Sequence, residues 1–486
     1  MMDYLRKSIV EIHDAILRGD VTPLELVKEA IEKAKKDTNN AFEYIAEKEA
    51  LEAVQNLDES LKDSLFYGIP VVIKDNFSTK DIPTTGSSNM LNGYIPIFSS
   101  EVVLRLEKAG AIVIGKTTLD ELAMGGSGTI GHKGKTYNPW DKTKTHQIGG
   151  SSCGSAAAMS AGIVPFAIGS DTGDSVRKPA SFAGLVGLKP TWGRISKFGL
   201  IPFASSLDHV GFFTRNVYDS ALALSVLAGR DEKDLTSSNE EVPNYADGIK
   251  ESIKGKKIAV IKKIVDSISD KSVIESFNET VKGLIAKGAL VEYVEIDLKI
   301  LKAIYPTYLI ISCAEAGSNT ANLDGVKFGV REPGETFEEV VMNTRTKNFS
   351  PIVKRRLVIG SYSLLHENAD ELFVRAQKCR RLIVNAFNKV LEQYDAIYCP
   401  ASSSIAPAFD KIDDLFSDEY LIADNYMAFA NMAGLPSITL PIGFEDGLPF
   451  SGNITCRAFE EKTLFNISYH LEEVTGLKDL VAEDDK

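Results

Sequence analysis

Residues 148–191 form a tract rich in Gly and Ser that reads IGGSSCGSAAAMSAGIVPFAIGSDTGDSVRKPASFAGLVGLKPT. Apolar residues that would be buried on folding, such as Met159, Ile163 and Phe166, interrupt the tract, so a flexible linker is the weaker interpretation. A phosphate-binding loop is also disfavoured, because the tract holds neither GxxxxGK[ST] nor a GxGxxG that closes a strand-to-helix turn. The third interpretation is that small residues let backbone N–H groups and hydroxyls approach a substrate and stabilise developing negative charge.

Helical and strand-like segments alternate along the rest of the chain. Thr22 followed by Pro23, with Glu25 close behind, is typical of a helix start. Helical patterns also cover 102–109, 271–286 and 370–392. Brief apolar runs bounded by Gly, Lys or Pro predict buried strands at 71–73, 112–114, 163–168, 258–261 and 396–399. The alternation predicts an α/β fold.

We expect one domain over residues 1–486, divided into successive regions. Polar, charged residues at 231–256 predict a surface excursion, and the charged tail at 478–486 is expected to fray. The other regions are an N-terminal helical region (1–65), a core region that contains the Gly/Ser-rich tract (66–230), a mainly helical cap (257–392) and a return to the core sheet (393–475).

Composition narrows the class of protein. The 54 Lys and Arg against 67 Asp and Glu give a net charge of −13, which disfavours a broad nucleic-acid-binding face. No apolar run approaches the roughly 20 residues of a membrane span, so a cytoplasmic protein is expected, or one of an organelle matrix. The five cysteines are scattered and favour neither disulfides nor a zinc site.

A serine nucleophile needs a base, and none of the six histidines lies in a recognisable triad motif. A buried lysine can serve instead if burial lowers its pKa until the neutral amine is accessible. Lys74 follows an apolar strand-like run and is one candidate. The alternative interpretation is an ordinary solvated lysine at a strand end.

Three segments resemble the motifs of the amidase signature family: GIPVVIKDN at 68–76, GGSSCGS at 149–155 and GSDTGDSVR at 169–177. The resemblance implies a central mixed β-sheet covered by helices on both faces, with a helical cap inserted. It implies that Lys74 is the base, that Ser151, in a cis peptide, relays the proton, and that Ser175 is the nucleophile. The same resemblance assigns the oxyanion hole to the backbone N–H groups of Thr172, Gly173, Asp174 and Ser175.

Within that family, the segments at 116–125, 315–325 and 353–360 are similar to the glutaminase subunits of tRNA-dependent amidotransferases. By this resemblance Arg356 binds the α-carboxylate of glutamine, Asp424 pairs with its α-ammonium, and Tyr308 contacts the substrate. An Arg fork and an Asp are natural complements of a free amino acid. On local sequence alone, both charged residues could be solvated surface groups.

The resemblance also implies a reaction and partners. Glutamine would be hydrolysed to glutamate, and the ammonia would convert Glu-tRNA(Gln) to Gln-tRNA(Gln) in protein biosynthesis. The chain would form a heterotrimer with the B and C subunits of the amidotransferase. The B subunit would bind most of the tRNA and use ATP and Mg²⁺. The chain itself would then need no cofactor and no metal of its own, and it would not contact a membrane.

Four positions depart from the family pattern: Asp174, Cys153, Lys178 and Ile148 replace the usual Gly, Gly, Gln and Pro. A carboxylate at Asp174 aimed inward would oppose the tetrahedral intermediate, and Cys153 is expected to be a small packing residue. Three alternatives stay open: a stand-alone amidase, a catalytically impaired assembly subunit or, least favoured, a nucleotide-binding protein.

Overall fold

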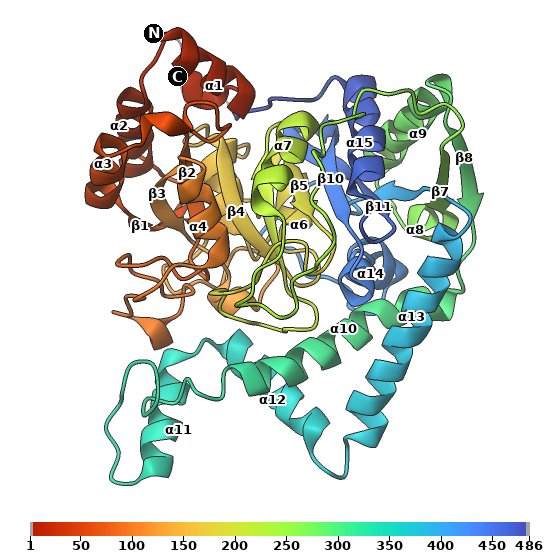
Figure 1. Ribbon diagram of the computed structural model, residues 1–486. Coiled ribbons are helices and arrows are strands. Elements are labelled where there is room, and N and C mark those ends of the chain that lie inside the picture. Colours follow the sequence, from red (N-terminus) through yellow and green to blue (C-terminus); the bar gives the residue numbers. More distant parts are fainter. Residues whose placement is uncertain (1–2, 483–486) are drawn as a thin grey trace.

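The structure is a computed structural model that describes residues 3–482 and is built on one 11-stranded sheet, in the order β1-β3-β2-β4-β6-β5-β10-β11-β9-β7-β8 (Figure 1). The strands are β1 Phe42–Ile45, β2 Pro70–Lys74, β3 Ile112–Thr117, β4 Phe166–Asp171, β5 Val186–Lys189, β6 His209–Thr214, β7 Lys257–Ile261, β8 Leu290–Val294, β9 Ala396–Pro400, β10 Ser437–Glu445 and β11 Leu448–Cys456. The helices are α1 Ile9–Arg18, α2 Pro23–Lys35, α3 Glu47–Gln55, α4 Glu101–Lys108, α5 Cys153–Ser160, α6 Arg177–Ala183, α7 Val217–Leu227, α8 Lys262–Asp266, α9 Lys271–Ala286, α10 Leu298–Asn319, α11 Phe337–Asn348, α12 Pro351–Leu364, α13 Arg375–Leu391, α14 Ala428–Ala433 and α15 Glu461–Thr475.

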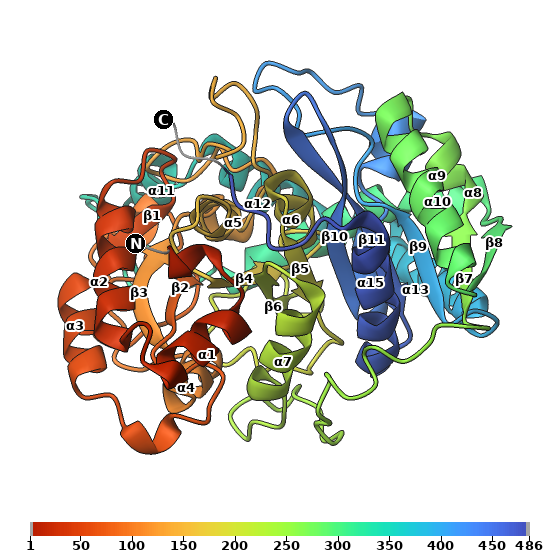
Figure 2. The ribbon, with the colours of Figure 1, turned by 90° about the horizontal axis from the view of Figure 1, so that it is seen from above.

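The sheet is mixed. Strand β2 pairs in parallel with β3 and β4, and β7 pairs in parallel with β8 and β9. The strands between these two groups pair antiparallel. Helices α5 and α6 cover one face of the centre of the sheet, and α4, α7 and α15 cover the other (Figure 2). The predicted α/β fold, with helices on both faces of a central mixed sheet, is therefore confirmed.

Local sequence explains where the predicted helices begin. The Thr22 side chain accepts a hydrogen bond from the N–H of Glu25, whose carboxylate in turn accepts from the N–H of Thr22, so a capping box starts α2. Pro23 takes the first helical position, where its missing N–H costs nothing. Helix α9 begins after Asp270, whose side chain accepts from the N–H groups of Ser272 and Val273.

The predicted strands at 71–73, 112–114, 258–261 and 396–399 lie within β2, β3, β7 and β9. The run at 163–168 starts later than predicted, because β4 begins at Phe166. Gly162 has a positive φ of 71°, which ends the preceding helical turn. Pro165 has no N–H to donate to a strand partner, so pairing starts only after it.

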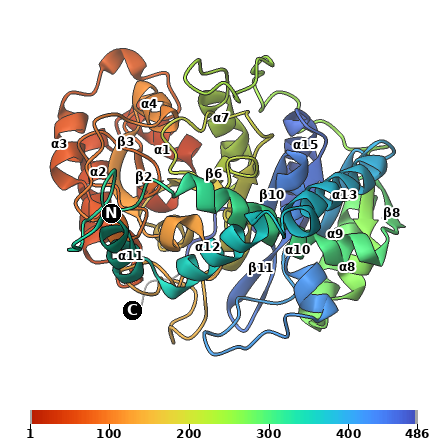
Figure 3. The ribbon, with the colours of Figure 1, turned by 90° about the horizontal axis from the view of Figure 1, so that it is seen from below.

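Helices α10 to α13 cross below the sheet and form the cap (Figures 1 and 3). The predicted cap region, 257–392, begins with β7 and β8, which belong to the edge of the central sheet. We therefore place the start of the cap at α10. The rest of the regional division stays a prediction.

The charged tail expected to fray is described as far as Ala482, and 483–486 lie outside the described residues. Its first part is held in place: the N–H of Asp479 donates to the carbonyl of Arg215 at 3.0 Å, and the N–H of Ala482 donates to the carbonyl of Ser160 at 2.8 Å. None of the helices within 3–482 has the length and apolar character needed to cross a bilayer.

Candidate active site

The Lys74 amine lies at the end of β2, fully buried among three serines. Its Nζ is 2.7 Å from the Oγ of Ser151, 2.9 Å from the Oγ of Ser152 and 2.9 Å from the Oγ of Ser170. The structure thus places the predicted base in direct contact with the predicted relay serine. Ser152 and Ser170 were not singled out from the sequence, although both lie in the motifs quoted above.

The Lys74 Nζ has four oxygen partners, because the Ser170 carbonyl lies 3.3 Å away in addition to the three hydroxyls. The Ser152 hydroxyl donates to the carbonyl of Ser170 at 3.2 Å, so toward Lys74 it acts as an acceptor. The Ser170 hydroxyl accepts from the Asn76 side-chain amide at 2.9 Å and also from Lys74. A neutral amine has two hydrogens and one lone pair, so a deprotonated Lys74 could accept the proton of Ser151, whose Oγ is the nearest of the four oxygens at 2.7 Å.

Burial lowers the pKa of Lys74 to about 7, because the charged ammonium form is desolvated; nearby acidic groups, Asp120 and Asp171 among them, oppose the shift. An ordinary lysine is almost entirely protonated at neutral pH, whereas this one is divided between its two forms. The amine can therefore accept a proton under physiological conditions, as the sequence analysis required of a lysine base.

Ser151 lies in the turn that enters α5, and the Gly150–Ser151 peptide bond is cis. A Cβ added at Gly150 would lie 2.0 Å from a carboxylate oxygen of Asp120, so only glycine fits there. That carboxylate accepts the N–H groups of Ser127, Gly128, Thr129 and Ile130 at 2.9–3.1 Å. Asp120 therefore fixes the loop against which the turn packs, a role that the sequence did not reveal.

Ser175 lies in the turn between β4 and α6 and is 4% exposed. Its carbonyl accepts a hydrogen bond from the N–H of Ser152 at 3.2 Å, which joins this turn to the turn that carries Ser151. The Asp171 carboxylate accepts from the N–H of Val176 at 3.0 Å. The predicted nucleophile thus lies on a buried turn whose backbone is hydrogen-bonded to Ser152, the residue that follows the predicted relay serine.

Asp174 lies in the same turn and is partly exposed. Burial raises the pKa of its carboxyl to about 6, Lys178 opposes the shift, and Asp171 and Asp424 contribute further like charge. The Thr172 hydroxyl donates to the carboxylate of Asp208 at 2.7 Å. The predicted oxyanion loop therefore carries a carboxyl that is neutral in mild acid and charged above about pH 6.

Two cap helices supply Tyr308, which packs on this loop, and Arg356, which lies beside Tyr308. The position that a Cβ of Gly173 would occupy is 3.0–3.3 Å from ring atoms and the hydroxyl of Tyr308, on α10. A Cβ at Gly360 would lie 2.0 Å from the carbonyl of Cys313, so glycine allows α12 to approach α10 closely. The Arg356 guanidinium on α12 lies 5.5 Å from the centre of the Phe203 ring.

The Nη1 of Arg356 is buried and has no hydrogen-bond partner among residues 3–482, while the guanidinium as a whole interacts with Tyr308 and Cys313. A buried guanidinium nitrogen left unpaired is costly, and an anion such as a carboxylate would satisfy it. The neighbouring Tyr308 hydroxyl can donate a second hydrogen bond. This corner of the site is therefore suited to bind a carboxylate.

Asp424, the third predicted substrate contact, lies at the end of a short helical turn at 419–423. Its carboxylate accepts the N–H of Ser403 at 3.1 Å. The Lys178 ammonium donates to the Asp424 carbonyl at 2.8 Å and is 3.9 Å from its carboxylate. The Lys178 ammonium thus partly compensates the negative charge of the Asp424 carboxylate, the group predicted to bind the α-ammonium of the substrate.

Cys153 is 1% exposed, and burial raises the pKa of its thiol to about 12. Its Sγ lies 3.6 Å from the carbonyl of Thr118. A protonated, buried thiol is a poor nucleophile, which agrees with a packing role. No group of three or more His, Cys, Asp or Glu within 3–482 is arranged to hold a metal ion.

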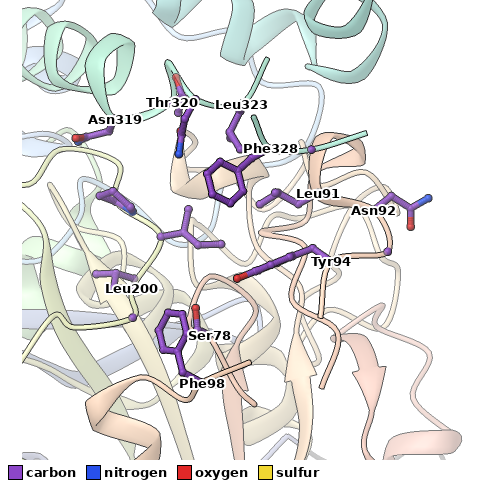
Figure 4. Close-up of a pocket in the computed structure, with 16 residues that line it drawn as sticks. Ser78, Leu91, Asn92, Tyr94, Phe98, Leu200, Asn319, Thr320, Leu323 and Phe328 are labelled. Carbon is purple, nitrogen blue, oxygen red and sulfur yellow. The ribbon is translucent and has the colours of Figure 1, made fainter. Parts of the chain in front are cut away.

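A cavity of about 530 Å³ is lined by many apolar side chains (Figure 4). It is lined by side chains such as Leu91, Tyr94, Leu200 and Phe328 and by none of the predicted catalytic or substrate residues. Its wall contacts the segment that follows Lys74, where the N–H of Ile201 donates to the Asn76 carbonyl at 2.8 Å. We assign the reaction to the Lys74 and Ser151 site because the chemically matched groups converge there.

Comparisons with known proteins agree with this geometry. The model of the amidase family matches residues 24–465. The chain is 42% identical over 484 residues to the A subunit of the glutamyl-tRNA(Gln) amidotransferase of Latilactobacillus sakei, covering 98% of this chain and 97% of the relative. It is 39% identical over 486 residues to the protein of the same name from Persephonella marina, covering 98% of each.

Two solved structures place the fold. A crystal structure of the glutamyl-tRNA(Gln) amidotransferase A subunit from Thermotoga maritima is 35% identical with a TM-score of 0.81, covering 100% of this chain and 99% of that one. A peptide amidase from Stenotrophomonas maltophilia has the same TM-score of 0.81 at 25% identity, covering 99% of each chain. The backbone is therefore equally similar to both proteins, and sequence identity separates them.

Proposed function

The chain belongs to the amidase family, and we propose that it is the glutamine-hydrolysing A subunit of a glutamyl-tRNA(Gln) amidotransferase. The observation that carries the substrate assignment is the buried, unpaired Nη1 of Arg356 beside Tyr308, whose ring packs on the oxyanion loop. A hydrolase of simple amides has no need for such a group, whereas free glutamine presents a carboxylate to it.

The proposed reaction is acyl transfer through Ser175. Neutral Lys74 takes the proton of Ser151, which takes that of Ser175, and the Ser175 Oγ bonds to the side-chain amide carbon of glutamine. The backbone N–H groups of 172–175 stabilise the oxyanion. When the C–N bond breaks, the proton returns through Ser151 to the leaving nitrogen, and ammonia departs. Water then attacks the ester, and glutamate is released.

Substrate binding follows from the charges around the turn. Arg356 and Tyr308 hold the α-carboxylate, and Asp424 pairs with the α-ammonium. Because all three act on the α-groups, they place the side-chain amide at the turn that carries Ser175. Proximity of this kind contributes to the rate only when the geometry is held closely.

The proposed assembly is a heterotrimer with the B and C subunits of the amidotransferase. Ammonia passes to the B subunit, which binds most of the Glu-tRNA(Gln) and supplies ATP and Mg²⁺ chemistry, while the C subunit joins the other two. The names of the relatives as subunits of an amidotransferase support a multi-subunit complex. The net charge of −13 is consistent with tRNA held mainly by a partner. We place the complex in the cytoplasm or an organelle matrix.

The test measures ammonia release by the purified chain, alone and with its partner subunits, from glutamine and from propanamide. We expect hydrolysis of glutamine and little release from propanamide, which has no α-groups for the clamp. Equal rates with the two amides would favour a stand-alone amidase.

A stand-alone amidase is the second candidate, because the peptide amidase has a TM-score as high as that of the amidotransferase subunit. Because Asp174 lies in the oxyanion loop, a catalytically impaired assembly subunit is a further alternative. A fluorophosphonate probe separates this last possibility, since an impaired site would leave Ser175 unlabelled.

A further inference from the structure

Asn431, on the short helix α14, is 1% exposed and contacts the loop that carries the nucleophile. Its side-chain Nδ2 donates to the Asp171 carboxylate at 2.9 Å and to the Asp171 carbonyl at 3.0 Å. Its Oδ1 accepts from the Arg177 guanidinium at 2.7 Å. One side chain from the C-terminal part of the chain therefore binds both ends of the turn 171–177.

Arg177 and Asp171 in turn fix the backbone of that turn. The two side chains form a bidentate ion pair, in which the Nε and Nη2 of Arg177 donate to the Asp171 carboxylate at 3.1 and 3.0 Å. The same Nη2 donates to the carbonyl of Gly173 at 2.6 Å. Since the Gly173 carbonyl belongs to the peptide whose N–H is on Asp174, holding it also sets the direction of that N–H.

An asparagine is suited to this position because its amide offers a donor and an acceptor on one short side chain. Asp171 and Arg177 are fully buried, and Asn431 adds a donor for the first and an acceptor for the second to the contacts that Arg177 makes with the Met427 carbonyl and the Ser437 hydroxyl. An aspartate at 431 would accept from Arg177 but would place a second carboxylate about 2.9 Å from that of Asp171. An alanine would leave both partners without this contact.

We propose that Asn431 is a positioning residue for amide hydrolysis, which locks the Asp171 and Arg177 pair and thereby aims the oxyanion-loop N–H groups at the substrate. This inference rests on the proposed function, because the reaction that Asn431 would assist is the proposed hydrolysis of glutamine. Asn431 contacts neither substrate nor reacting atoms, and it acts through Arg177 and the Gly173 carbonyl.

The test is an exchange of side chains between 171 and 431. Asn431→Asp is expected to lower kcat for glutamine, measured in the complex with the partner subunits, by about 100-fold and to change KM by less than about twofold, because the α-group clamp lies elsewhere. In the double variant Asp171→Asn with Asn431→Asp, one carboxylate and one amide again face each other beside Arg177. We expect the kcat of this double variant to be at least about tenfold higher than that of Asn431→Asp alone.

The matched control is Asn466→Asp on α15. Asn466 is also a buried asparagine, and its Nδ2 donates to the carbonyls of Gly248, Ile249 and Glu251, away from the site. We expect its kcat to stay within about twofold of the wild type. Equal losses of kcat in Asn431→Asp and Asn466→Asp would overturn the proposal. So would a double variant whose fold-loss in kcat equals the product of the fold-losses of Asp171→Asn and Asn431→Asp.

A second readout separates this inference from the proposed function. The labelling rate of Ser175 by a fluorophosphonate probe depends on the same N–H groups but not on glutamine, and it should follow the kcat pattern of the variants. If the wild type is labelled but does not hydrolyse glutamine, the proposed function fails while the labelling rates still test Asn431. If Asn431→Asp does not fold, Asn431→Ser, which loses the amide acceptor but stays polar, takes its place in both assays.

Discussion

The catalytic core and the cap contribute to the site in different ways. In the core, Lys74, Ser151 and Ser175 are at most 4% exposed and are held by hydrogen bonds among neighbouring turns. In the cap, Arg356 comes from α12, whose outer face exposes apolar side chains such as Val358 (67%) and Tyr362 (57%). We therefore propose that the core breaks the bond on a fixed frame, that the cap contributes Tyr308 and Arg356 to the selection of glutamine, and that Asp424 contributes from outside the cap, after the turn at 419–423.

This division explains how a peptide amidase and one subunit of an amidotransferase can share the backbone equally well. In the proposed mechanism the bond is broken by core residues, and the choice of amide depends on Tyr308 and Arg356 from the cap together with Asp424. Variants in the core should therefore abolish every reaction of the site, while variants in the cap should affect reactions that depend on the α-groups of glutamine.

The largest effect is expected for Ser175→Ala, which removes only the hydroxyl of the predicted nucleophile. Ammonia release should fall by more than about a thousandfold, while the melting temperature stays near that of the wild type. Cys153→Ser is the matched control and should keep most activity, because the buried thiol is protonated. The reverse result would make Cys153 the nucleophile and would end the account of the core.

Lys74→Ala should be nearly as inactive, and the pH profile of the wild type tests the reason. With the Lys74 pKa at about 7, kcat/KM should rise from pH 5 to 8, because only the neutral amine accepts a proton. Lys80→Ala, on an exposed lysine of the following loop, should leave the profile unchanged. A wild-type profile that is flat from pH 5 to 8 would remove Lys74 as the base.

Arg356→Ala tests the cap. It leaves the substrate carboxylate unpaired in a partly desolvated site, which costs about 2–5 kcal/mol in kcat/KM for glutamine. The fluorophosphonate labelling of Ser175 should be nearly unchanged, since the probe has no α-carboxylate. Arg355→Ala, on the exposed side of the same helix, is the control. Equal loss of labelling would mean that Arg356 supports folding, and unchanged glutamine activity would move the clamp elsewhere.

The smallest effect is expected for Asp174→Asn, at the boundary between the two regions. Above pH 6 the Asp174 carboxylate is charged and opposes the oxyanion, so its removal should raise kcat by about two- to fivefold at pH 8. At pH 5 the carboxyl is already mostly protonated, and the two proteins should have similar kcat values. A fall in kcat at both pH values would mean that the Asp174 side chain assists the reaction.

The sequence was a good guide to the core and a poorer one to its supports. The motifs around Lys74, Ser151 and Ser175 are local, so their positions could be predicted, and apolar runs located most strands. Asp120 and Asn431 could not be found in this way, because their roles depend on distant contacts: Asn431 and Arg177 are 254 residues apart in the chain. The apolar run at 258–261 predicted a strand but could not show that this strand joins the edge of the central sheet, because pairing depends on residues distant in the chain.

The most direct test of the proposed function follows the nitrogen atom. Glutamine labelled with ¹⁵N in its side-chain amide is supplied to the reconstituted complex with Glu-tRNA(Gln), ATP and Mg²⁺, and the label is measured in Gln-tRNA(Gln). The wild type should transfer the label, whereas the Ser175→Ala complex should transfer none from glutamine but should still use ¹⁵N-ammonium chloride at the wild-type rate. Loss of the ammonium-dependent reaction in that variant, or label transfer from glutamine without the Ser175 hydroxyl, would contradict the account.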